Sequence, residues 1–206
     1  MTQSMDKISH NRRSVRLKTY DYSQPGAYFV TICAYNRECL FSEIKDGILI
    51  LNKYGEIAKD EWERTGRIRP NIVIDHFVIM PNHLHGIIII DGVGAHCNVP
   101  LQVTEQTEKF GCSTKNSIPT IVKLFKSTTT KQINELRNIP GAVVWQRNYY
   151  EHVIRDDAEL NRIRQYIMEN PLKWDTDSEN QNVNRDSLLS KLMPGKNEGF
   201  ARHEKI

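Results

Sequence analysis

The stretch VIMPNHLHGIIII, residues 78–90, joins two apolar runs through a short polar interruption. The β-branched residues on both sides predict two strands, over residues 72–80 and 84–90. Pro81 and Asn82 lie between the strands, and residues of these types favour a tight turn. We therefore predict a hairpin or a β-bulge corner at this point, with the two histidines of the stretch close to its turn.

The two histidines, His83 and His85, are two residues apart in the sequence. In a strand such residues point to the same face, roughly 7 Å apart by the rise per residue. Two neutral imidazoles placed in this way can bind one divalent cation. Histidines packed at the end of a strand give the same pattern, so the spacing alone leaves both a metal site and a packing role open.

The rest of the chain predicts further strands and helices. In chain order, the expected elements are a strand over 27–35, a helix over 52–66, a helix over 117–137, a short strand and turn over 143–155, and a helix over 156–171. The apolar faces of the last two helices are predicted to be Ile121, Leu124, Phe125 and Ile133, and Leu160, Ile163 and Ile167. Residues 1–19 are expected to form a flexible basic arm, residues 20–174 one domain, and residues 175–206 a polar tail.

The composition is that of a globular protein: 206 residues, 39% hydrophobic and 26% charged. A chain of this length can bury a core without disulfides. Its four cysteines form no C-x-x-C pair and no secretory signal precedes them, so we expect free thiols in the bacterial cytoplasm. His96, Cys97 and Cys112 lack the spacing of zinc ligands. No apolar run reaches the roughly 18 residues of a membrane span.

The N-terminal arm is basic although the net charge of the chain is only +3. Residues 7–18 include Arg12, Arg13 and Arg16 and contain no acidic residue. Such an arm suits a polyanion such as nucleic acid. A solvated terminus has the same composition, and this stretch does not decide between the two.

The helix predicted over residues 156–171 carries a second pair of polar residues. Tyr166 and Asn170 are four residues apart and therefore lie on one helix face, at the edge of the apolar stripe. The amide oxygen of Asn170 could complete a site of two histidines and one oxygen, and the hydroxyl of Tyr166 could point to the same place. An ordinary amphipathic helix with a half-buried tyrosine explains the pattern equally well.

Three segments taken together are more specific than the histidine pair. MPNHLHG (80–86), WQRNYYEHVIR (145–155) and LNRIRQYIMENP (160–171) follow one another in an order that resembles the single-tyrosine HUH transposases, and most closely the REP-associated tyrosine transposases. The segment over residues 12–37 also looks like the start of that family, so the resemblance runs from about residue 12 to residue 174. HUH stands for two histidines around a hydrophobic residue.

The resemblance implies a fold and a site. The fold is α+β, a ferredoxin-like antiparallel sheet with helices packed on one face. The metal histidines of the family match His83 and His85, and its nucleophilic tyrosine matches Tyr166. The residue that completes the metal site matches Asn170, and the implied cofactor is Mg²⁺ or Mn²⁺.

The implied activity is metal-dependent cleavage and rejoining of single-stranded DNA through a covalent 5′-phosphotyrosine intermediate. The bond energy is kept in that intermediate, and the sequence has no G-x-x-x-x-G-K-[ST] loop for nucleotide hydrolysis. The partner is expected to be single-stranded DNA with hairpin structure. The resemblance leaves open whether the protein is a monomer or a homodimer.

Basic and aromatic side chains are the candidates for DNA contacts. The predicted set is Arg12, Arg13, Arg16, Lys123, Lys126, Lys131, Arg147, Trp145, Tyr149 and Tyr150. A solvated helix face would account for the lysines of the helix, and packing in the core would account for the aromatic residues.

Three other functions are compatible with parts of the pattern. A DNA-binding protein without catalysis would need the same surface, and an adaptor protein could use the histidines for packing alone. An unrelated metal-dependent hydrolase is a weaker candidate. An H-x-H barrel needs about 250 residues in β/α units, and a nucleobase deaminase needs H-x-E and P-C-x-x-C segments that the sequence lacks.

Overall fold

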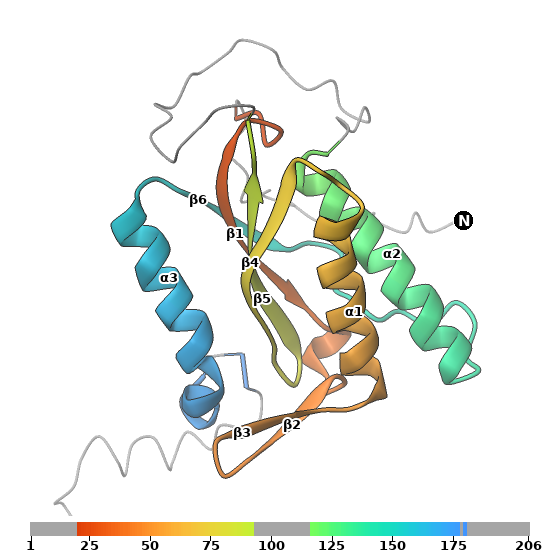
Figure 1. Ribbon diagram of the computed structural model, residues 1–206. Coiled ribbons are helices and arrows are strands. Elements are labelled where there is room, and N and C mark those ends of the chain that lie inside the picture. The colour runs from red at the N-terminus through yellow and green to blue at the C-terminus, as the bar shows by residue number, and fades with distance from the viewer. Residues whose placement is uncertain (1–19, 93–115, 178, 181–206) are drawn as a thin grey trace, which may run out of the picture.

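The computed structural model describes residues 20–92, 116–177 and 179–180 (Figure 1). The main sheet has the strand order β4-β5-β1-β6, and every neighbouring pair is antiparallel. Its strands are β1 (Gly26–Cys33), β4 (Ile72–Ile79), β5 (His83–Ile90) and β6 (Tyr150–Ile154). The helices are α1 (Lys53–Arg67), α2 (Ile118–Leu136) and α3 (Asp157–Glu169), with 3₁₀ turns η1 (Tyr35–Arg37) and η2 (Asn170–Thr176). A separate hairpin joins β2 (Ser42–Lys45) to β3 (Ile48–Leu51).

The connections give the predicted ferredoxin-like fold. Leaving out the β2–β3 hairpin, the chain runs β1-α1-β4-β5-α2-β6. In the sheet the first of these four strands, β1, lies between the third, β5, and the fourth, β6, and the second, β4, is at the edge beside β5. The two inner strands, β5 and β1, carry the core. The prediction of an α+β ferredoxin-like fold is therefore confirmed.

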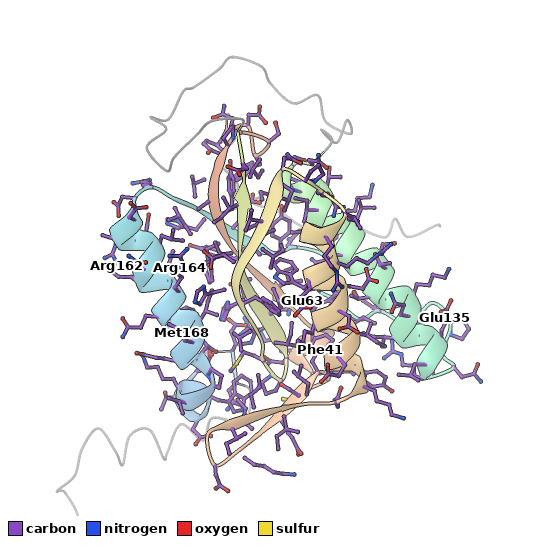
Figure 2. The ribbon with its side chains drawn as sticks, in the orientation of Figure 1. Phe41, Glu63, Glu135, Arg162, Arg164 and Met168 are labelled. Carbon is purple, nitrogen blue, oxygen red and sulfur yellow. The ribbon has the colours of Figure 1, made fainter. Side chains whose placement is uncertain are left out.

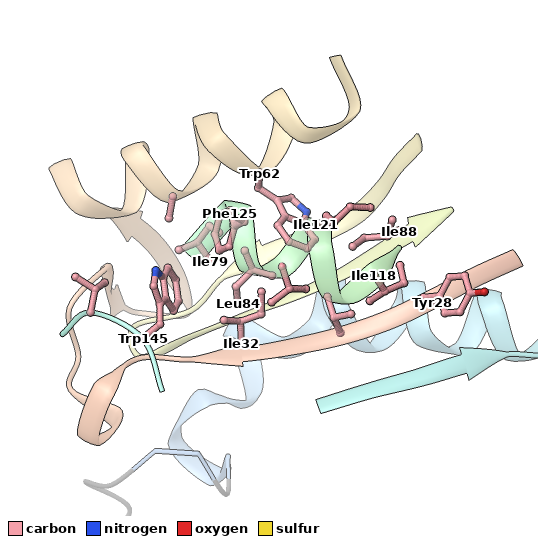
Figure 3. Close-up of a cluster of buried hydrophobic side chains, with 14 of the residues drawn as sticks. Tyr28, Ile32, Trp62, Ile79, Leu84, Ile88, Ile118, Ile121, Phe125 and Trp145 are labelled. Atoms are coloured by element: carbon pink, nitrogen blue, oxygen red, sulfur yellow. The ribbon is translucent and has the colours of Figure 1, made fainter. Parts of the chain in front are cut away.

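Two helices cover one face of the sheet, as expected. Trp62 of α1 packs edge-on against Phe125 of α2, with ring centroids 5.2 Å apart. Below these rings lie apolar side chains of the sheet, among them Ile32, Leu84 and Ile88 (Figure 3). This cluster is the larger of the two cores among the described residues.

The third helix lies on the opposite face, which differs from the expectation that all helices share one side (Figure 1). Leu160 and Ile167 of α3 pack with Val78, Met80 and Ile87 in a second core. The physical reason lies in β5, whose residues are apolar on both faces. A sheet with two apolar faces must be covered on both sides.

An ion pair fixes α3 against the edge strand β4. The guanidinium of Arg164 donates to the carboxylate of Asp75 from Nε, at 2.9 Å, and also from Nη2. Figure 2 shows Arg164 on α3 between Arg162 and Met168. The bond lies where the register of β4 shifts, between Ile74 and Phe77.

The predicted hairpin between β4 and β5 is present. The backbone N–H of Met80 donates to the carbonyl of His83 at 2.8 Å across the turn.

On α2, one residue of the predicted apolar face is wrong: Leu124 is 47% exposed, whereas Val122 is buried. The other three predicted residues, Ile121, Phe125 and Ile133, are buried, and the buried stripe begins at Ile118. Among the described residues no helix is long and apolar enough to cross a membrane.

Candidate active site

The two histidines lie side by side on the face of the sheet that α3 covers. His83 is opposite Cys33 of β1, and His85 is opposite Thr31. The exposed fractions are 0% for His83 and 4% for His85, and their ring centroids are 4.4 Å apart. The strand therefore projects both imidazoles together into one buried place, as the spacing predicts.

Each histidine is held by a hydrogen bond at Nδ1. The Nδ1 atom of His83 is 2.8 Å from the side-chain oxygen of Asn82, and that of His85 is 2.8 Å from the hydroxyl of Thr31. The Nε2 atom of His83 is buried and has no hydrogen-bond partner within the described part of the chain. Each ring is thus held at Nδ1 by a neighbouring side chain, which leaves Nε2 on the opposite side of the ring.

Both imidazoles are neutral at physiological pH. Burial, together with the smaller effects of the neighbouring His85 and Arg37, lowers the pKa of His83 to about 2. Burial also lowers the pKa of His85 to about 3. A neutral imidazole is the form that binds metal ions.

Tyr166 reaches the histidine pair from α3. Its hydroxyl oxygen is 3.2 Å from Nε2 of His85, and its ring lies edge-on to His85 and to Phe29. The residue is 42% exposed, so one side of the phenol is open to a substrate. Burial raises its pKa, the carboxylate of Asp177 raises it further, and a hydrogen bond with Asn170 opposes both.

Asn170 lies at the junction of α3 and η2 and is 2% exposed. Its side-chain oxygen is buried without a hydrogen-bond partner among the described residues. No group of three His, Cys, Asp or Glu side chains gathers in the part of the chain that the structure describes, so a third ligand would have to be of another type. The buried side-chain oxygen of Asn170 is of such a type, and Nε2 of His83 is likewise buried without a partner among the described residues.

The segment after α3 adds residues that the sequence did not indicate. The ring of Trp174 in η2 lies 6.2 Å from that of His83. The carboxylate of Glu179 forms an ion pair with Arg37 at 3.2 Å and accepts a hydrogen bond from the thiol of Cys33 at 3.6 Å. This polar segment has no periodicity that would place it beside the histidines.

A hollow with a volume of about 460 Å³ opens beside Tyr166 and His85. Tyr149 and Tyr150, two predicted DNA contacts, line it together with Gln146 and Asn148. Tyr150 is 46% exposed. The structure thus brings two residues that are distant from the histidines in sequence into the same hollow.

The other predicted DNA contacts lie elsewhere. Lys123, Lys131 and Arg147 are exposed. Lys126 donates to the carbonyls of Gln146 and Asn148, both at 2.9 Å, and so holds the chain before β6.

Trp145, for which the sequence left base stacking and core packing open, is a core residue. It is 5% exposed, its ring stacks on Phe41, and its Nε1–H donates to Thr129 at 2.8 Å. Arg12, Arg13 and Arg16 of the predicted arm lie outside the described residues.

Comparison with known proteins finds a sequence relative and similar folds among solved structures. A protein of Haemophilus influenzae, itself uncharacterized, is 45% identical over 180 residues, which cover 86% of this chain and 97% of the relative. The chain matches no family model.

Among solved structures, a REP-associated tyrosine transposase bound to a REP hairpin is similar over 95% of this chain and 99% of its own, with a TM-score of 0.46 and 19% identity. A putative transposase of Deinococcus radiodurans is similar over 78% of this chain and 97% of its own, with a TM-score of 0.41 and 13% identity.

Proposed function

This chain belongs to the same family as the Haemophilus influenzae protein, and we propose that it cleaves and rejoins single-stranded DNA through Tyr166. The observation that carries the proposal is the position of the phenol. Its oxygen lies 3.2 Å from Nε2 of His85, one of two buried neutral histidines, and its exposed side faces a hollow. A nucleophile, a ligand pair and space for a substrate thus occur together, as an active site requires.

In the proposed reaction the oxygen of Tyr166 attacks the phosphorus of a DNA backbone phosphate. The new bond joins the tyrosine to the 5′-phosphate, and the bond from phosphorus to the 3′-oxygen breaks, leaving a free 3′-hydroxyl. Attack by a 3′-hydroxyl on the phosphotyrosine reverses these steps and rejoins the strands. The number of phosphodiester bonds is conserved, so no nucleotide cofactor is needed.

A divalent cation, Mg²⁺ or Mn²⁺, would be held by His83, His85 and Asn170. The residues present fit such an ion, because two imidazoles are neutral and two of the candidate ligand atoms are buried without a partner. When bound, the ion would supply positive charge to the phosphate. The protein's own contribution is to hold these three side chains rigidly beside Tyr166.

The hollow is the proposed place for the nucleotides that flank the cleaved phosphate. Its volume is within the usual range for small-ligand sites. Tyr149 and Tyr150 would stack on bases, while Lys123 and Arg147 would contact phosphates farther along the strand. The proposed substrate is single-stranded DNA that carries a hairpin, in the bacterial cytoplasm, and the protein would act on it as a monomer or a homodimer.

A gel experiment tests the proposal. Labelled single-stranded hairpin DNA from beside the protein's own gene is incubated with the wild type and with Mg²⁺ or Mn²⁺, and denaturing electrophoresis reveals any protein-linked DNA. We expect a covalent band that Tyr166→Phe abolishes and that Tyr150→Phe, a matched tyrosine of the same hollow, retains. An unchanged band in Tyr166→Phe would refute the assignment. DNA binding without any band would instead favour a DNA-binding protein without catalysis.

A further inference from the structure

Asn82, in the turn before β5, is fully buried and contacts the first histidine of the site. We propose that Asn82 is a positioning residue that keeps the proton of His83 on Nδ1, so that the lone pair of Nε2 faces the site. The inference rests on the proposed metal site and deepens it, because it says which residue prepares His83 as a ligand.

The orientation of the Asn82 amide follows from its two other partners. The side-chain nitrogen donates to the backbone carbonyl of Glu179 at 2.6 Å and to that of Arg37 at 3.2 Å. Carbonyl oxygens only accept hydrogen bonds, so the flipped amide would direct its own oxygen at two acceptors. The backbone is held as well, because the carbonyl of Asn82 accepts from the N–H of Ala34 at 2.8 Å. The side-chain oxygen therefore faces His83.

The orientation of the amide in turn decides the tautomer of His83. An amide oxygen has no hydrogen to donate, so the 2.8 Å contact requires the proton of the imidazole to be on Nδ1. A neutral ring with a proton on Nδ1 carries its lone pair on Nε2. That atom is the one that is buried without a partner among the described residues. Metal-binding histidines are commonly oriented in this way by an acceptor behind the ring.

His85 has a different kind of partner. The hydroxyl of Thr31 can donate or accept, so its 2.8 Å contact with Nδ1 is compatible with either tautomer. The Nε2 atom of His85 is also close to the hydroxyl of Tyr166, which can donate or accept too. Of the two histidines of the site, His83 is therefore the one whose tautomer is imposed by a group that cannot donate.

Nitrogen NMR of the imidazole rings tests the inference in the metal-free full chain. We expect His83 of the wild type to be protonated at Nδ1 and unprotonated at Nε2. Asn82→Ala, which removes the acceptor oxygen, should give a mixture of tautomers. Asn134→Ala removes another buried asparagine that binds a carbonyl, far along α2, and should not change His83. A proton on Nε2 in the wild type, or an unchanged tautomer in Asn82→Ala, would overturn the inference.

Calorimetric titration with Mn²⁺ provides the second measurement. Loss of an outer partner of a metal histidine typically weakens binding about 10- to 100-fold, and we expect Asn82→Ala to show a loss of this size. Asn134→Ala should lose much less affinity than this lower limit of about 10-fold.

The two failures can be told apart. If His83→Ala binds Mn²⁺ as tightly as the wild type, the proposed metal site is wrong, and the NMR result still judges the role of Asn82. If Asn82→Ala does not fold, the tautomer of His83 measured by NMR in the wild type tests the inference by itself.

Discussion

The neutral histidine pair should make the protein lose stability between pH 7.5 and pH 5. In the unfolded chain each histidine has a pKa near 6.5 and becomes protonated at pH 5. In the folded protein the pKa values of His83 and His85 are about 2 and about 3, so both stay neutral. The unfolded state therefore binds more protons, and stability that is fully present above pH 6.5 is lost as the pH falls.

The magnitude follows from the same values. At pH 5 each unfolded histidine gains roughly 2 kcal/mol from protonation, about 1.36 kcal/mol for each of the 1.5 pH units below 6.5. The two residues together give about 4 kcal/mol, a large part of the stability of a typical domain. The result does not depend on the folded values in detail, because both lie at least two units below pH 5.

The assay is urea unfolding followed by circular dichroism at pH 7.5 and pH 5, with a chelator present. The free energy of unfolding of the wild type should fall between the two pH values by about 4 kcal/mol more than that of the double variant His83→Gln/His85→Gln. Other titrating groups contribute equally to both proteins and cancel. Asn134→Ala, which should lower stability alike at both pH values, controls for general weakening. An equal fall in wild type and double variant would refute the argument that both histidines are buried in neutral form.

Three further predictions test the packing and the hollow. Gly86→Ala would place a methyl group 2.6 Å from the ring of Trp62, so we expect thermal unfolding to show a loss of stability of about 1–3 kcal/mol. In the control Gly66→Ala the nearest atom to the new methyl group, in Ile74, is 3.3 Å away, and the stability should stay close to that of the wild type. Tyr150→Ala should weaken binding of single-stranded DNA by about 1–3 kcal/mol in a fluorescence titration, and equal affinity would argue against stacking. Lys123→Ala should reduce the slope of the logarithm of DNA affinity against the logarithm of salt concentration by the equivalent of about one phosphate contact. An unchanged slope would show that the DNA does not contact Lys123.

The sequence predicted the elements of the fold better than their arrangement. The hairpin around Pro81 and the helix that carries Tyr166 follow from local patterns, because turn residues and helical periodicity act over a few positions. An apolar stripe, however, shows only that a helix is buried and not on which face of the sheet it packs. The expectation that the helices share one face came from the resemblance alone, and the structure places α3 on the face opposite α1 and α2.

The site was predicted in part for a similar reason. Spacing placed His83 and His85 on one face of a strand, and Tyr166 and Asn170 on one face of a helix, but the resemblance to a family was needed to join the two pairs. Glu179 was missed because polar residues without periodicity carry no local signal. Charge alone also could not separate Lys123, which is exposed, from Lys126, which binds backbone carbonyls.

The contact between Tyr166 and His85 suggests that the imidazole removes the proton of the phenol, but the pKa values argue against that role. A phenol has a pKa near 10, and that of Tyr166 is raised by burial and by Asp177. The conjugate acid of His85 has a pKa of about 3. Transfer of the proton from the phenol to His85 would therefore be unfavourable by at least 7 pKa units, which is roughly 10 kcal/mol. His85 is too weak a base to generate the phenolate by itself, whereas the burial that weakens it as a base keeps it neutral as a ligand. For the proposed reaction, these pKa values thus favour a role for His83 and His85 as neutral ligands of a cation beside Tyr166 over general base catalysis by His85.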